Sequence, residues 1–139
     1  MSKNPYQYCA KTNEIEVYVR PFFANDLSEP AFHKYVYVYK VKIINKCEGT
    51  IKLLSRKWHI VEEDGTHNVI TGQGVVGQQP VLKTDEEFEY ASQAILYSKS
   101  GMMYGEYNCI YLENDETISV KIPAFSLDLN LDFTKRIEA

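Results

Sequence analysis

Arg56 is the residue whose type and position most directly suggest a binding site. In the segment LLSRKWHI, the alternation of a β-strand places Arg56 in one row with Leu54, Trp58 and Ile60. An unpaired charge in such an apolar row is costly, so Arg56 reaches the rim, stacks on an aromatic ring, pairs with a buried carboxylate, or is turned by a bulge. Its planar guanidinium suits a carboxylate or a phosphate, which makes Arg56 the first candidate for contact with a ligand or a partner.

A glycine-rich segment, GQGVVG at residues 72–77, has the G-x-G-x-x-G spacing of dinucleotide-binding loops. Its continuation, Gln78-Gln79-Pro80, is unsuited to begin the helix that such a loop needs, and no βαβ alternation surrounds it. Glycines that permit a bulge and a sharp bend are the favoured interpretation. The N–H groups of a glycine loop can also hold an anion without that fold. The candidate site for a phosphate-type anion or a partner therefore comprises Arg56, Gly72, Gly74, Gly77 and Gln79.

Two histidines in the segment HIVEEDGTH could act as metal ligands, but their spacing argues against it. With Asp64-Gly65 as a two-residue turn, His59 and His67 point to opposite faces of the hairpin. A three-residue loop puts them on one face but about 13 Å apart. The expected contact of His67 is a cross-strand pair with Glu62, and no metal site is predicted.

The sequence contains no catalytic set and no sign of a cofactor. It lacks a G-x-S-x-G elbow, a P-loop and an HExxH motif. The three cysteines, Cys9, Cys47 and Cys109, are widely spaced and form no CxxC pair, and Cys109 lies inside a strand pattern as a small core residue. These observations predict a protein that is not an enzyme.

The elements that must position these residues are β-strands. Short alternating runs separated by turn residues recur along the chain, at about 15–20, 35–44, 51–61, 68–70, 75–82, 88–97, 102–112 and 118–129. Seven or eight strands at this spacing predict an all-β protein built as a sandwich of two antiparallel sheets. One domain over residues 1–139 is expected, with its core at about 12–130 and loose ends at 1–12 and 131–139.

Charge and hydropathy exclude several functions. A net charge of −4 and an isoelectric point near 5.4 argue against a nucleic-acid binder. No apolar run reaches the roughly 18 residues of a membrane-spanning helix, so no membrane association is expected. The start of the chain resembles neither a signal peptide nor a transit peptide, and the cysteine usage fits a reducing cytoplasm.

Four motifs together resemble the ApaG family in order and spacing: LLSRKW at 53–58, GQGVVGQQP at 72–80, GMMYGEY at 101–107 and VKIPAFSL at 120–127. The resemblance covers about residues 12–130, and it implies an immunoglobulin-like sandwich of the fibronectin type III kind. It also implies a small bacterial cytoplasmic protein with no secure catalytic activity, associated in some bacteria with cobalt resistance and magnesium efflux. One departure is Lys57, where the family commonly has histidine in its S-R-H-W motif.

The function expected from residues and resemblance together is a non-enzymatic protein-interaction domain. Similar domains in eukaryotes are fused into F-box and DNA-polymerase-delta-interacting proteins, which implies protein binding. A link to divalent cations would then be indirect. The alternative is binding of a small anion, a pyrophosphate or a nucleotide, on the loop at 72–77 with Arg56. A monomer and a homodimer are both compatible with the sequence.

Overall fold

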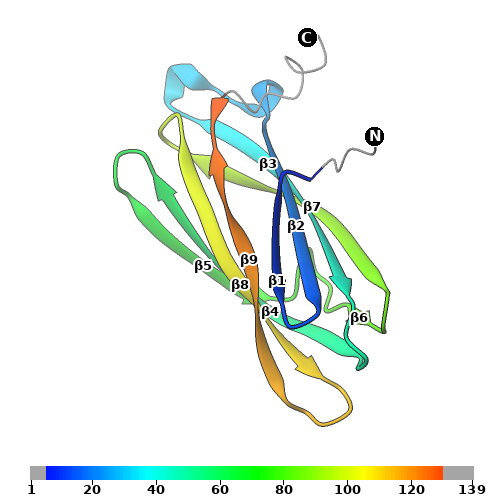
Figure 1. Cartoon of the computed structure of the whole chain (residues 1–139). Coiled ribbons are helices and arrows are strands. Elements are labelled where there is room, and N and C mark those ends of the chain that lie inside the picture. Colours follow the sequence, from blue (N-terminus) through cyan, green and yellow to red (C-terminus); the bar gives the residue numbers. More distant parts are fainter. Residues whose placement is uncertain (1–5, 130–139) are drawn as a thin grey trace, which may run out of the picture.

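The protein folds as a sandwich of two antiparallel β-sheets, described for residues 6–129 by a computed structural model (Figure 1). The first sheet has the order β1-β2-β3-β7, with bounds Tyr8–Thr12, Ile15–Phe23, Tyr35–Asn45 and Glu87–Leu96. The second has the order β5-β4-β8-β9, with bounds His67–Gln73, Ile51–Glu62, Gly101–Tyr111 and Thr117–Leu127. A short strand, β6 (Val81–Leu82), pairs with β4, and two 3-10 turns, η1 (Asn25–Leu27) and η2 (Pro30–Phe32), connect β2 to β3. The predicted two-sheet sandwich is confirmed.

Nine strands are present, against the expected seven or eight: β1 is additional, and the expected run at 75–82 contains only the two-residue strand β6. Strand β1 forms within the region 1–12 that the sequence predicted to be loose, and that part of the prediction is wrong. It pairs with β2 from Tyr8 to Thr12, and the Tyr8 ring packs on Phe125 with 6.0 Å between centroids. The other expected loose ends, residues 1–5 and 131–139, lie outside the described residues.

Large aromatic residues lie at the centre of the core between the sheets. The expected row on β3, from Tyr35 through Tyr37, Tyr39 and Val41 to Ile43, is buried throughout. Tyr107 and Phe125 of the opposite sheet are also fully enclosed. Because side chains alternate across each strand, this row packs against the inward row of the second sheet.

A β-bulge in β4, just before Arg56, changes which residues of the strand face the core. The pairing with β8 shifts between Leu53 and Ser55, so Leu54 is an extra residue. Leu53 therefore takes the inward position, while Arg56 and Trp58 continue the inward row farther along. The prediction that Leu54 shares the row of Arg56 is wrong for this reason.

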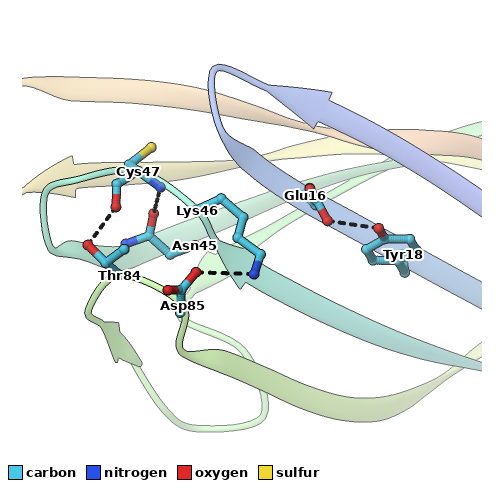
Figure 2. A network of polar contacts seen from close by, with 7 residues as sticks. All are labelled: Glu16, Tyr18, Asn45, Lys46, Cys47, Thr84 and Asp85. Carbon is cyan, nitrogen blue, oxygen red and sulfur yellow. Dashed lines mark hydrogen bonds and ion pairs between the residues drawn. The ribbon is translucent and has the colours of Figure 1, made fainter.

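A buried asparagine fixes the corner where β3 turns toward β4. The Asn45 side chain is 0% exposed; its Oδ1 accepts a hydrogen bond from the Cys47 N–H at 2.9 Å, and its Nδ2 donates to the carbonyls of Gly49 and Leu82. Thr84 donates to the Cys47 carbonyl at 2.6 Å (Figure 2). These bonds satisfy buried polar groups and attach β6 to the end of β3.

Within residues 6–129, no helix is long and apolar enough to cross a membrane.

Candidate functional site

The side chain of Arg56 hydrogen-bonds to the main chain of the glycine loop at residues 72–77. It lies opposite Gly72 of β5 and Tyr107 of β8, and its Nη1 donates to the carbonyls of Gln73 at 3.0 Å and Gly74 at 2.8 Å. A Cβ atom added to Gly72 would lie 2.7–2.8 Å from the guanidinium, so the missing side chain of Gly72 leaves space for Arg56. Neutral carbonyl oxygens, rather than a buried carboxylate, therefore compensate the charge of Arg56.

Several hydrogen-bond donors of the loop are bonded within the protein. Gly74 N–H and Gln79 Nε2 both donate to the carbonyl of the bulged residue Leu54, at 2.8 and 2.9 Å. Val75 and Gln78 exchange two main-chain bonds and close a tight turn. Gly74 and Gly77 have φ values of +62° and +78°, so the bend that the glycine pattern predicts is present. The loop and Arg56 form one mutually bonded unit.

A shallow depression of about 420 Å³ lies beside this unit and carries charges of both signs. Lys57 and Glu106 lie on its wall. Hydrogen bonds from Ser119 and Lys121 hold the pKa of the Glu106 carboxyl below its usual value. The wall therefore presents a carboxylate next to its lysine, which is unfavourable for a dedicated anion pocket.

The two histidines meet on one face, and the prediction that kept them apart is wrong. His59 Nδ1 and His67 Nε2 lie 3.0 Å apart, and the His59 ring stacks on Tyr104 with 4.5 Å between centroids. The reason is the register of β4 with β5. His67 opposes Val61, so His67 lies diagonally across from His59, displaced by two residues along the strand. A count of diagonal pairs for the three-residue turn would have found this contact.

Glu62 is a structural residue that the sequence reasoning assigned to the wrong partner. It is 5% exposed and accepts hydrogen bonds from Tyr97 N, Ser98 N and Ser98 Oγ at 2.8–2.9 Å. It does not pair with His67. The signal was its inward position, two residues beyond Ile60 in the alternation.

Strand β5 is exposed on both faces. Val69 is 50% exposed, and Ile70, which opposes the buried Trp58, is 46% exposed. In Figure 1, β5 runs along the left border of the sandwich. Its seven residues include no proline, lysine, arginine, aspartate or glutamate. Such residues are the usual protection of a sheet edge against further pairing.

The main-chain groups of Val69 and Thr71 point away from β4. Glu62 N donates to Thr66 O, and Gly74 N donates to Leu54 O, so the hydrogen-bonded pairs in between fall on Asn68, Ile70 and Gly72. The alternate residues, Val69 and Thr71, direct their N–H and C=O groups to the outer side, where no other strand of residues 6–129 lies. This edge can accept a further strand.

The edges formed by the other long strands are protected, and β6 is an edge of only two residues. Strand β9 lies beside β1, where Lys121 N donates to Thr12 Oγ1 at 2.9 Å. Strand β7 carries Glu87 and Glu89, and β1 carries Lys11. Among these edges, β5 alone lacks a charged or covering group.

The fold and these surfaces define a class: a small two-sheet β-sandwich with a candidate docking edge. The chain belongs to the ApaG family, because the family model described as the ApaG domain (DUF525) matches residues 25–111. It is 44% identical over 121 residues to Protein ApaG of Agrobacterium fabrum, covering 87% of this chain and 92% of the relative. It is 41% identical over 121 residues to Protein ApaG of Paramagnetospirillum magneticum, which again covers 87% of this chain and 92% of the relative.

A solved structure has the same fold. The crystal structure of a Bordetella pertussis protein named as ApaA superimposes with a TM-score of 0.80 at 35% identity. The match covers 86% of this chain and 96% of that one. The resemblance expected from the four motifs is therefore confirmed.

Proposed function

We propose that this protein is a non-enzymatic cytoplasmic docking module whose β5 edge accepts an extended segment of another protein as an additional strand. The proposal rests on three properties of β5 that no other described edge combines. The strand has no charged residue, it is exposed on both faces, and the main-chain groups of Val69 and Thr71 point outward. In strand addition, main-chain hydrogen bonds supply affinity and alternate side-chain contacts supply specificity.

The chemistry of β5 indicates what kind of segment fits. An added strand would place side chains over Ile70 on the inner face and over Val69 on the outer face. Apolar residues at alternate positions would bury both of them. Under this proposal, any link to cobalt or magnesium homeostasis runs through the partner.

Anion binding at the glycine loop is less well supported by the geometry. Arg56, Gly74 and Gln79 already donate to carbonyls of the same chain. An anion would have to compete with these bonds for the same donors.

The experiment uses a photo-crosslinking amino acid at position 69 in cells that make the protein, followed by affinity measurements on the purified pair. Thr71→Pro removes the outward N–H while leaving the bonds to β4 intact, since proline is tolerated at an edge. We expect it to weaken binding about tenfold or more. Thr71→Val keeps the N–H and should bind nearly as the unmodified chain does.

Two results would contradict the proposal. One is a captured protein that binds Thr71→Pro as tightly as the unmodified chain. The other is a crosslink from position 69 to a second copy of this chain, with sedimentation showing a homodimer.

A further inference from the structure

The histidine pair is a cluster of metal-ligating side chains that the proposed docking contacts of Val69, Ile70 and Thr71 do not use. His59 comes from β4 and His67 from β5, and their near nitrogens are 3.0 Å apart. His67 is exposed and His59 is half-buried, so solvent and dissolved ions reach the pair. No function described above uses these side chains.

We propose that His59 Nδ1 and His67 Nε2 form a binding site for a late first-row divalent cation such as Zn²⁺. Imidazole is a preferred ligand of zinc, nickel and copper ions. Zinc–nitrogen bonds of about 2.0–2.1 Å put two nitrogens on one ion about 2.9–3.4 Å apart, for octahedral or tetrahedral angles. The separation of 3.0 Å lies inside this range before any metal binds.

A neighbouring aromatic ring holds His59 in a fixed orientation, which favours metal binding. Tyr104 of β8 stands directly opposite His59, and the two rings are parallel within 1°. This stack limits the rotation of the His59 ring, so less side-chain entropy is lost when the ion binds. The cation takes the place of the bridging proton. The ring that donates this proton shifts to its other neutral tautomer, so the site releases no net proton.

Two imidazoles leave part of the coordination shell open. Among residues 6–129, no third histidine, cysteine or carboxylate joins the pair, so water molecules complete the shell. The site also crosslinks β4 and β5 near their turn. Binding therefore stabilises the folded state over the unfolded one, in which the two rings are not held together.

The test titrates the full chain with Zn²⁺ by calorimetry and follows the histidine signals by long-range ¹H–¹⁵N NMR. We expect one saturable site, a rise in melting temperature, and shifts of His59 and His67. His33, at the end of η2, should not shift. His67→Gln should weaken Zn²⁺ binding about tenfold or more, and the double variant His59→Gln/His67→Gln should abolish it. Mg²⁺, which prefers oxygen ligands, should not compete.

Matched controls separate this site from other metal binding and from the docking edge. His33→Gln should bind Zn²⁺ as the unmodified chain does, and so should Thr71→Pro, because neither touches the pair. Binding retained by the double variant, or no saturable binding at millimolar Zn²⁺, overturns the proposal. Circular dichroism of each variant verifies that the fold is intact.

Discussion

Arg56 shows how a charged side chain can occupy the inward row of a strand. Its guanidinium passes beneath Gly72 and binds the carbonyls of Gln73 and Gly74. The glycine pattern and the arginine, which look like two separate binding motifs in the sequence, are thus two halves of one structural unit. The guanidinium of Arg56 fits only because residue 72 has no side chain, and the carbonyls of the loop accept hydrogen bonds from it.

A double-mutant cycle tests this mutual dependence. Arg56→Ala should lower the free energy of unfolding by about 1–3 kcal/mol, because two carbonyls lose a charged donor. Gly72→Ala should cost a similar amount by displacing the guanidinium. Its effect should nearly vanish in the Arg56→Ala background, where the clash is absent. Urea unfolding measures all four proteins; strictly additive losses would contradict the coupling.

Val76 is held in an unfavourable backbone conformation. Its φ is +44°, which a β-branched residue rarely adopts, and its side chain is 50% exposed. Val76→Asn should therefore raise the free energy of unfolding by about 1 kcal/mol. Val69 is equally exposed but lies in a regular strand, so Val69→Asn is the matched control and should give no gain. Thermal unfolding compares the two variants, and equal effects would contradict the explanation.

At the scale of elements, Glu62 ties the second sheet to the turn between β7 and β8. Its carboxylate accepts three hydrogen bonds from Tyr97 and Ser98. The neighbouring Glu63 is exposed and accepts one bond, from Lys99 N at 3.0 Å. Glu63 is therefore a matched control for Glu62, because the two residues are adjacent and of the same type but differ in burial and in their hydrogen bonds.

Glu62→Ala should lower the free energy of unfolding by about 2–3 kcal/mol, because two main-chain N–H groups and the Ser98 hydroxyl lose a charged acceptor. Glu63→Ala should lower it by well under about 1 kcal/mol. Denaturant titrations provide the comparison. Equal losses in the two variants would show that the buried carboxylate has no special role.

The strands were predictable from alternation, whereas their exact register was not. The row from Tyr35 to Ile43 and the turn at Asp64-Gly65 follow from periodicity and turn residues. The bulge at Leu54 has no sequence mark, because one extra residue in a strand changes no local propensity. The contact of His59 with His67 depends on the three-residue turn that sets the register of β4 with β5, so periodicity alone did not find it. The carbonyl partners of Arg56 come from a loop conformation that only the assembled sheets define.

For the molecule as a whole, burial decides which thiols react. Cys109 lies in the core at 2% exposure, and burial raises its pKa to about 12. Cys9 on β1 is exposed. Cys9, Cys47 and Cys109 are all free thiols, and no disulfide forms among the described residues.

A thiol reagent at pH 8 should therefore label Cys9 in the native protein and leave Cys109 unmodified, since the thiolate is the reacting form. Cys109 should react only after denaturation. Mass spectrometry of tryptic peptides locates the label. Rapid native labelling of Cys109 would indicate that the sandwich opens far more readily than its packing implies.

Hydrogen exchange of the β5 amides tests the docking account most directly. In the isolated protein, Asn68 and Ile70 should exchange slowly because they bond to β4, while Val69 and Thr71 should exchange fast. On binding the crosslinked partner, Val69 and Thr71 should become protected, with little change along β7 or β1. Protection that appears on those strands instead, with Val69 and Thr71 still exchanging fast, would contradict the account.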